Sequence, residues 1–312
     1  MPSLLDRFKG CLIGHAVGDG LGAPFEGLTS ELILAGHGRA ADIVAHPPVE
    51  TLYCTDDTHM SLGVAEVLCD AGTADEEKLM GAFSRNYDPR RGYGPGMRRL
   101  LEAAVLGEDW NALATNLFEG GSYGNGGAMR AAPVGLFFHA DLARVWEEAG
   151  RQAAVTHRHP LGIEGAQIFA MAVALAARGE AGDKDAFYGE LYRRATQDEY
   201  QWLLRTAWRL TERDSLALLG SSLEAHRSVV TAIACFAIAP DSYENTIARA
   251  LALGDDTDTL MGMAGAISGA HLGIGAVSER LVGMLEEGVR GKDQIQNAAV
   301  ALHAKLADNE RH

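Results

Sequence analysis

The sequence lacks several patterns that would assign a protein to a common class at once. Its four cysteines (Cys11, Cys54, Cys69 and Cys235) stand far apart and form no CxxC pair, which excludes a zinc knuckle or a dithiol redox motif. Free thiols in a reducing compartment are the simplest interpretation. No basic run or patch occurs, and the net charge is -15, so direct nucleic-acid binding is not expected.

Membrane and secretion signals are also missing. The N-terminal segment carries Asp6, Arg7 and Lys9 and contains no apolar signal-peptide core. We find no unbroken run of about 18 apolar residues, so no membrane span is expected. Together with the unpaired cysteines, these absences predict a cytoplasmic protein.

Apolar residues are plentiful, because they make up 47 % of the 312 residues and can bury a sizeable core. Alternating apolar and polar positions do not occur over a useful length, so strands are not expected. Composition does not shift sharply anywhere, and no linker is indicated. We therefore predict one all-α domain over residues 1–312. A compact domain of 33.2 kDa can act alone, and we expect a monomer.

Apolar residues recur with the helical period in most of the chain. The pattern predicts helices over residues 4–21, 57–71, 75–87, 97–106, 110–117, 128–138, 142–155, 161–178, 185–195, 200–211, 227–239, 243–253, 257–272, 279–287 and 293–307. Residues 22–54, rich in Gly, Pro and His, are interpreted as a long irregular segment, and a loop of that length is often functional. Residues 88–96 and 120–127 are loops by composition.

Two predicted helices carry a row of glycines. The first has one every four residues, and the helix over 257–272 has a similar row: Gly10, Gly14, Gly18, Gly262, Gly265 and Gly269. A row without side chains lets another helix approach closely. Helix packing is therefore the expected role of both rows.

Two acidic stretches stand about 200 residues apart, TDDT over 55–58 and DDTDT over 255–259, and each opens a predicted helix. Like charges this dense repel unless a cation lies among them. A helix N-terminus supplies only about half a positive charge. The donors are all oxygens, which suits Mg²⁺ or Mn²⁺ better than Zn²⁺. Either stretch alone is more often helix capping, but two of them favour a shared metal site.

A glycine-rich loop, GGSYGNGG over 120–127, precedes a predicted helix. Its backbone N–H groups can converge on an anion, helped by the helix dipole. The loop matches neither a Walker motif nor a dinucleotide fingerprint, because no Gly-Lys-Ser/Thr follows and no βαβ unit surrounds it. A flexible turn is the alternative. Tyr123 adds a flat surface on which a base can stack.

Two single residues are weaker candidates. His157, in THRHP over 156–160, precedes a predicted helix, where a histidine is more often a cap or a packing residue. Glu26 follows Pro24 and Phe25, and a carboxylate held beside apolar groups can have a raised pKa and act as a base or an acid. A solvated loop acid is the alternative for Glu26.

Five segments in this order resemble the ADP-ribosylglycohydrolase superfamily: GCLIGHAVGDGLGAPFEG over 10–27, TDDT over 55–58, GSYGNGGAMR over 121–130, THRHPLG over 156–162 and GDDTDT over 254–259. Any one of them is weak, but together they are highly specific. RGYGPG over 91–96 and the complete glycine loop resemble the branch that removes ADP-ribose from serine and degrades poly(ADP-ribose), more than the arginine-specific branch.

The resemblance implies an all-α, single-domain orthogonal helix bundle with a dinuclear Mg²⁺ or Mn²⁺ centre in a central cleft. The residues carried over by motif are Thr55, Asp56, Asp57, Asp256, Asp258 and Thr259 as metal ligands, Glu26 and Asp256 as catalytic groups, and Gly94, Gly121, Ser122, Tyr123, Gly124, Asn125 and His157 as ligand-binding residues. Here Asp255 replaces a glycine that is common in the family, and we expect its side chain to point outward. The implied partner is an ADP-ribosylated protein or an ADP-ribose-containing small molecule.

The implied reaction is hydrolysis of the glycosidic bond that joins ADP-ribose to its acceptor. Three alternatives remain open at this point. One is an arginine-specific hydrolase of the dinitrogenase-reductase-activating type. Another is a Mg²⁺-dependent phosphohydrolase that acts on the pyrophosphate. The last is a non-catalytic, metal-dependent ADP-ribose-binding module.

Overall fold

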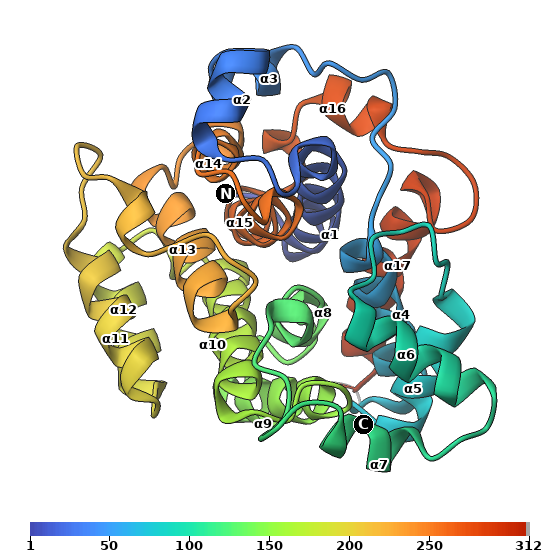
Figure 1. Ribbon diagram of the computed structural model, residues 1–312. Helices are drawn as coiled ribbons and strands as arrows, with labels where there is room; N and C mark the ends of the chain where they lie inside the picture. Colours follow the sequence, from blue (N-terminus) through green and yellow to red (C-terminus); the bar gives the residue numbers. More distant parts are fainter. Residues whose placement is uncertain (310–312) are drawn as a thin grey trace.

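Helices follow one another through nearly the whole of the computed structural model, which describes residues 1–309 (Figure 1). The α-helices are α1 (Leu4–Gly22), α2 (Ser30–His37), α3 (Ala40–Ala45), α4 (Asp56–Ala71), α5 (Glu76–Asn86), α6 (Pro95–Val105), α7 (Trp110–Asn116), α8 (Ala132–Phe137), α9 (Leu142–Ala154), α10 (Pro160–Ala177), α11 (Lys184–Arg194), α12 (Asp198–Arg209), α13 (Ala225–Ile238), α14 (Tyr243–Leu251), α15 (Thr257–Leu272), α16 (Glu279–Met284) and α17 (Lys292–Asn309). Short 3-10 turns are η1 (Ala23–Phe25), η2 (Asn125–Gly127), η3 (Leu216–Leu218) and η4 (Ile274–Ala276).

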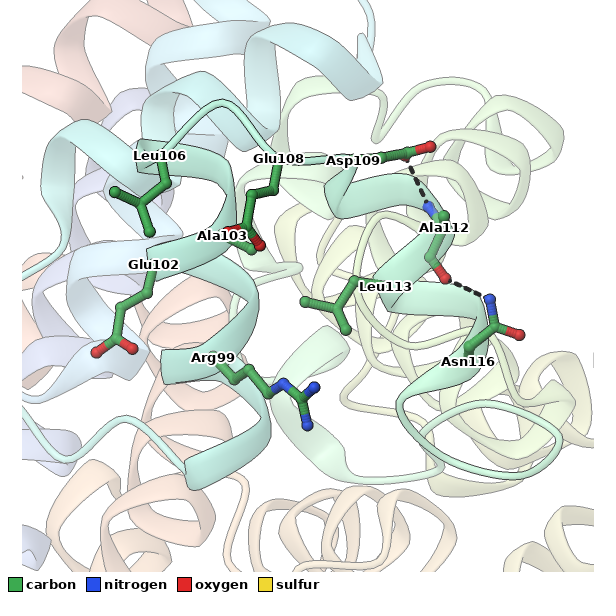
Figure 2. A pocket seen from close by; sticks show the side chains of 9 residues that line it. All are labelled: Arg99, Glu102, Ala103, Leu106, Glu108, Asp109, Ala112, Leu113 and Asn116. Atoms are coloured by element: carbon green, nitrogen blue, oxygen red, sulfur yellow. Dashed lines mark hydrogen bonds between the residues drawn. The ribbon is translucent and has the colours of Figure 1, made fainter.

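The all-α prediction is confirmed, since residues 1–309 contain no strand, only three isolated β-bridges. Most predicted helices end within about three residues of the observed bounds, as expected from capping signals such as the Ser3–Asp6 capping box of α1. Small surface helices such as α6 and α7 (Figure 2) were also predicted. The last three residues, 310–312, of the predicted single domain lie outside the described part.

Two segment predictions were wrong, and one further helix is three residues shorter than predicted. Residues 22–54 are not irregular throughout, because they contain η1, α2 and α3. Thr29 caps α2 by accepting a hydrogen bond from the Leu32 amide, and buried Ile33 and Val44 anchor the two helices. The predicted helix over 128–138 begins later, at Ala132, because the glycine loop continues into η2 and a turn. The predicted helix over 279–287 ends at Met284.

The expected packing role of the glycine rows is confirmed, and the partner of each row is the other one, since α1 and α15 lie side by side (Figure 1). A Cβ added to Gly269 would lie 1.9 Å from the Gly10 carbonyl oxygen, and one added to Gly18 would lie 2.2 Å from that of Met261. A Cβ on Gly22 would lie 2.6 Å from Cα of Asp258. The backbones can therefore touch only because both rows lack side chains. This contact brings the end of α1 beside the start of α15.

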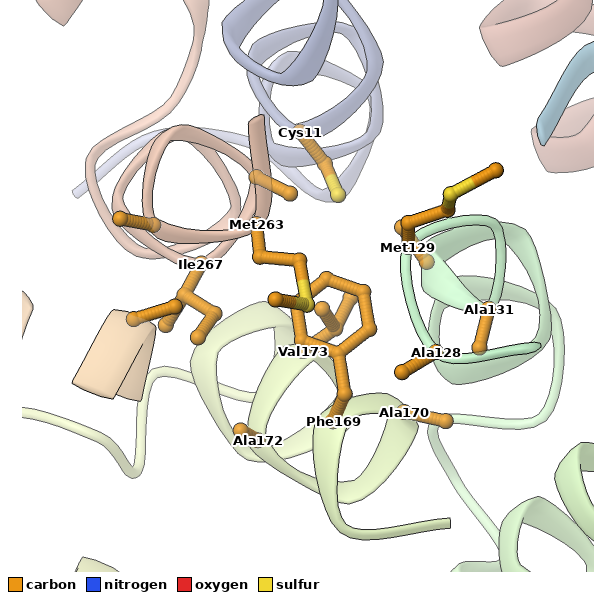
Figure 3. Packing of buried hydrophobic residues seen from close by; sticks show 14 of the residues in the cluster. Cys11, Ala128, Met129, Ala131, Phe169, Ala170, Ala172, Val173, Met263 and Ile267 are labelled. Carbon is orange, nitrogen blue, oxygen red and sulfur yellow. The ribbon is translucent and has the colours of Figure 1, made fainter. Parts of the chain in front are cut away.

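The core is built around this helix pair. Met263 and Ile267 of α15 pack with Phe169 and Val173 of α10, and Cys11 of α1 faces the same cluster (Figure 3). These five side chains are fully buried. The four cysteines are free thiols. The core thus fixes α15 from several sides, which holds the acidic start of that helix in place.

Helix α10 bears on the expectation that no segment spans a membrane. Residues Pro160–Ala177 form a helix that is long and apolar enough, by length and composition, to cross a membrane. Glu164 is the charged residue in this stretch and interrupts its run of apolar residues. However, 78 % of the stretch is buried inside the protein, as in a core helix. The feature is thus weak support for a membrane span.

Candidate active site

Three carboxylates from two segments converge at the start of α15. Glu26, Asp256 and Asp258 each offer one oxygen, and these oxygens lie within 4.8 Å of one another. Backbone hydrogen bonds hold the two segments together, because the Gly27 amide donates to the Asp255 carbonyl and the Asp255 amide donates to the Leu28 carbonyl. Asp255 has a φ of 68° and an exposed side chain, so its carboxylate points outward as expected.

The start of α4 supplies two further acids, Asp56 and Asp57. Thr55 caps this helix, and its side chain accepts a hydrogen bond of 3.2 Å from the Asp57 amide. The Asp56 amide donates to the carbonyl oxygen of Arg91. The guanidinium of Arg91 in turn forms a bidentate pair with Glu286, with distances of 2.7 and 2.8 Å. The segment after α16 therefore braces the loop that faces Asp56.

Asp19, near the end of α1, ties that helix to α4. Its fully buried carboxylate accepts hydrogen bonds from the Thr55 amide and from the amide and hydroxyl of Thr58. We had not included Asp19 among the site residues. Its position three residues before Gly22, at the end of the helix that carries the glycine row, was the available signal, and the Asp19 side chain lies near Gly262 of α15.

Burial dominates the electrostatics of this acidic cluster. It raises the pKa of Asp56, Asp57 and Asp256 well above the ordinary value, and the Asp258 carboxylate raises these pKa values further. Burial and then Asp258 raise the pKa of Asp19 to about 7. Glu26 is exposed on its outer side, yet partial burial and then Asp258 also raise its pKa.

The cluster suits a divalent cation. Within residues 1–309, none of the buried aspartates Asp56, Asp57, Asp256 and Asp258 forms an ion pair with a basic side chain. Oδ2 of Asp57 is buried and has no hydrogen-bond partner in the same range. Charges of one sign in this arrangement repel unless a cation or protons neutralise them. Oxygen-only donors match the preference of Mg²⁺ and Mn²⁺.

A cavity of about 440 Å³ opens beside the cluster, a size typical of small-molecule sites. Of the predicted site residues, those that line it are Glu26, Asp56, Asp57, Gly94, Ser122, Gly124, Asn125, His157, Asp256, Asp258 and Thr259. Thr55, Gly121 and Tyr123 do not line it. The cavity thus joins the two acidic stretches and the glycine loop, while the roles assigned to individual residues stay predictions.

The glycine loop forms the wall opposite α4. Nδ2 of Asn125 donates to Oδ2 of Asp256 and also to the Ser228 hydroxyl, so the loop is fastened to the acidic cluster. Gly121 has a φ of 88°, and an added Cβ would lie 2.6 Å from the His159 amide nitrogen. Close backbone packing therefore accounts for this glycine. The ring of Tyr123 contacts His159 and is about half exposed, away from the cavity lining.

Among the lining residues that the sequence analysis did not name, two are notable for their chemistry. Phe118 is 47 % exposed and lies at the cavity, where it offers the flat surface that we had assigned to Tyr123. Arg130, the last residue of the loop motif, is fully buried and also lines the cavity. For Arg130, the available signal was a single arginine in an apolar stretch. For Phe118 there was no signal, because this residue precedes the glycine loop and belongs to no motif.

A second hollow, of about 490 Å³, lies between α6 and α7 (Figure 2). Its charged lining consists of Arg99, Glu102, Glu108 and Asp109. Asp109 caps α7 by accepting from the Ala112 amide, and the side chains do not converge on one point. This hollow is larger than the cavity at the acidic cluster. Because it lacks converging chemical groups, we place the active site at the acidic cluster.

Comparison with known proteins agrees with the arrangement of fold and cavity. A model of the ADP-ribosylglycohydrolase family matches residues 1–311. The chain is 32 % identical to the ADP-ribosylhydrolase ARH3 of Bos taurus, over 96 % of this chain and 93 % of that protein. It is 27 % identical to the ADP-ribosylarginine hydrolase Tri1 of Pseudomonas putida strain GB-1, over 96 % of this chain and 78 % of that protein.

A solved structure described as an ADP-ribosylglycohydrolase-related protein complex is similar throughout, with a TM-score of 0.74 and 26 % identity, covering 97 % of this chain and 98 % of that one. The fold is all-α, and the family match and the relatives named ADP-ribosylhydrolase ARH3 define the class as a hydrolase of glycosidic bonds. The chain belongs to the ADP-ribosylglycohydrolase family. The family resemblance, the fold class and the enzyme class expected from the sequence are thereby confirmed.

Proposed function

We propose that this protein is a divalent-cation-dependent hydrolase that removes ADP-ribose from an acceptor by cleaving the O-glycosidic bond, with serine-linked ADP-ribose or poly(ADP-ribose) as substrate. The observation that carries the proposal is the convergence of Glu26, Asp256 and Asp258 at one end of a cavity. The family match and the relatives named ADP-ribosylhydrolase ARH3 support the substrate class. The motifs over 91–96 and 121–130 support the acceptor class.

Carboxylate and hydroxyl oxygens of both helix starts would hold two Mg²⁺ or Mn²⁺ ions: Thr55, Asp56, Asp57, Asp256, Asp258 and Thr259. When bound, such cations supply Lewis-acid stabilisation for negative charge that develops on oxygen. Thr55 does not line the cavity, so its contribution would come through the cap that it forms on α4. Thr259 does line it.

The side chains of this protein would move the protons. Glu26 takes a proton from the attacking water, which adds its oxygen to the anomeric carbon of ADP-ribose. Asp256, held by Asn125, orients the acceptor oxygen that leaves and is placed to protonate it. The transition state resembles an oxocarbenium ion, as in other glycoside hydrolyses. Water is consumed, and the products are free ADP-ribose and the free acceptor hydroxyl.

The rest of the cavity would bind the ADP portion. Ser122, Gly124 and Asn125 line the cavity and would contact the pyrophosphate. The expected cradle of free backbone N–H groups is corrected at two positions, because the Gly124 amide donates to the Ser122 hydroxyl and the Asn125 amide donates to the Leu223 carbonyl. The exposed ring of Phe118 offers a stacking surface for adenine. Binding energy from these remote groups would position the reacting bond.

The test is incubation with serine-linked and arginine-linked ADP-ribosyl peptides and with poly(ADP-ribose), in Mg²⁺, in Mn²⁺ and in excess chelator. We expect free ADP-ribose from the serine-linked peptide and from the polymer, and no turnover in chelator. Release of AMP would identify a phosphohydrolase instead. Turnover of the arginine-linked peptide alone would assign the protein to the arginine-specific branch, and binding without turnover would identify a non-catalytic module.

A further inference from the structure

Arg130 is a buried cation on the cavity wall without a carboxylate partner. Its side chain is fully buried, and it forms no ion pair within residues 1–309. Burial lowers the pKa of Arg130 to about 9, so it stays charged at neutral pH. The guanidinium carbon lies 4.5 Å from the centre of the Phe83 ring. Removing a charged guanidinium from water is energetically costly, so packing alone does not explain a buried arginine at this position.

The hydrogen bonds of Arg130 lead to His157. Nε donates to the side-chain oxygen of Gln152, and Nη2 donates to the Gln152 carbonyl and, over 2.8 Å, to the hydroxyl of Thr156. The same hydroxyl lies 2.7 Å from Nδ1 of His157. Arginine can only donate, so one lone pair of the Thr156 oxygen is already occupied by a donor.

This arrangement determines where the imidazole proton lies. The Thr156 hydroxyl has one hydrogen to donate, and among the described residues Nδ1 of His157 is the acceptor within reach. If Nδ1 carried a proton, Arg130 and His157 would occupy both lone pairs of the Thr156 oxygen, and the hydroxyl hydrogen would be left without an acceptor among the described residues. Nδ1 is therefore the acceptor, and the neutral ring carries its proton on Nε2. Burial and the nearby Arg130 lower the pKa of His157 to about 3, which agrees with a neutral ring.

The ring is also held sterically, with Nε2 toward the cavity. A Cβ added to Gly126 would lie 2.8 Å from Cε1 and 3.0 Å from Nε2 of His157, so the imidazole lies against a bare backbone. His157 is 9 % exposed and lines the cavity, and its Nε2 forms no hydrogen bond with any residue of the described chain. Nε2 thus lies beside Gly124 and Gly126, which line the cavity, and its proton is left as a donor without a partner among the described residues.

We propose that Arg130 and Thr156 are positioning residues that lock His157 in the tautomer with its proton on Nε2, so that it donates a hydrogen bond to an acceptor oxygen of the bound ligand. The proposal deepens the proposed function, because the acceptor would be an oxygen of ADP-ribose. A neutral N–H of this kind can donate to either a phosphate oxygen or a hydroxyl oxygen, and it adds no positive charge beside the cation site.

The tautomer can be measured in the free protein, independently of any activity. In protein labelled with ¹⁵N-histidine, long-range proton–nitrogen spectra distinguish a protonated from an unprotonated ring nitrogen. Loss of one signal set in His157→Gln assigns His157. We expect an unprotonated Nδ1 and a protonated Nε2 in the wild type and in Thr156→Ser. In Thr156→Val we expect a mixture of both tautomers.

Binding of free ADP-ribose, measured by calorimetry with Mg²⁺ present, gives the second readout. Thr156→Val should weaken binding roughly tenfold, the size expected for one misplaced hydrogen bond, and Thr156→Ser should restore it. Thr246→Val is the matched control, because Thr246 is equally buried and donates to a backbone carbonyl far from the cavity. It should leave the affinity unchanged.

The outcomes separate the two proposals. A protonated Nδ1 in the wild type, or a Thr156→Val spectrum identical to the wild type, would overturn the positioning role. The same would follow if Thr156→Ser bound ADP-ribose as weakly as Thr156→Val. If Thr156→Val does not fold, Arg130→Lys replaces it in the test. This variant keeps the positive charge but lacks the forked donors of arginine, and it must then shift the tautomer of His157. Failure of the wild type to bind ADP-ribose while the tautomer is as expected would refute the proposed function alone.

Discussion

At the scale of single residues, Glu26 shows how environment can assign a role. It lies in the turn directly after η1, where its side chain comes close to the carboxylate oxygens of Asp256 and Asp258 although the residue is exposed. Partial burial and Asp258 raise its pKa, which is typical of a group that exchanges protons. The sequence context of Pro24 and Phe25 indicated this possibility. The nearness to Asp258 could not be read from the chain.

Replacing Glu26 with Gln tests this role. We expect kcat to fall about 100-fold to 10,000-fold, because a proton acceptor is lost, while the dissociation constant for ADP-ribose changes little. Steady-state kinetics and calorimetry measure the two quantities. Glu31→Gln is the matched control, since Glu31 is an exposed glutamate at the start of nearby α2. A normal kcat in Glu26→Gln would remove this residue from the mechanism.

At the scale of elements, the contact between α1 and α15 fixes the site. Gly10, Gly18 and Gly269 allow the two backbones to touch, and the ends of the touching helices carry Asp19 and Asp258. A small movement of α15 would therefore separate carboxylates that the site needs together. The packing of α1 against α15 and the affinity of the site for a metal ion should therefore change together.

Gly269→Ala should show this coupling. Its Cβ would lie 1.9 Å from the Gly10 carbonyl oxygen, so we expect a loss of about 2–3 kcal/mol in the free energy of unfolding and weaker Mg²⁺ binding. Chemical denaturation and calorimetry provide the measurements. Gly36→Ala is the control, because a Cβ there meets nothing within 4 Å, and it should leave stability unchanged or raise it by about 0.5–1 kcal/mol. Equal stabilities would contradict the close-contact account.

The sequence predicted the helices better than it predicted which side chains from distant segments lie close together. Glycine spacing and capping residues are local, so α1, α4 and α15 were found close to their observed bounds. The depth of Arg130 and the cavity position of Phe118 depend on which distant helices pack around them. Tyr123 was chosen for its place in the glycine loop, but the turn directs its ring to His159. Side-chain direction in a loop follows from tertiary contacts that local patterns do not contain.

At the scale of the whole molecule, the buried acids should make stability depend on pH. Asp19 has a pKa of about 7 against an ordinary value of 3.8, so the folded state holds a proton that the unfolded chain releases. Without divalent cations, the free energy of unfolding should therefore fall as pH rises from about 4 to about 7, since the unfolded state then binds fewer protons.

Added Mg²⁺ or Mn²⁺ should reverse this trend. Cations bind deprotonated carboxylates, so the rise in Tm on adding metal should be larger at pH 8 than at pH 5. Thermal unfolding at both pH values, with chelator or with metal, measures the effect. A metal-free Tm that rises across this pH range, or a metal effect that is equal at both pH values, would contradict the account of the buried carboxylates.

The most direct test of the central claim is calorimetric titration of Mg²⁺ and Mn²⁺ into the wild type and into the double variant Asp256→Asn/Asp258→Asn, with release of ADP-ribose measured in the same samples. We predict that the wild type binds the cations and turns over substrate. The double variant should keep its fold, because amides replace carboxylates of the same shape, and should lose both binding and turnover. Unchanged cation affinity and turnover in the double variant would contradict a catalytic metal site at the start of α15.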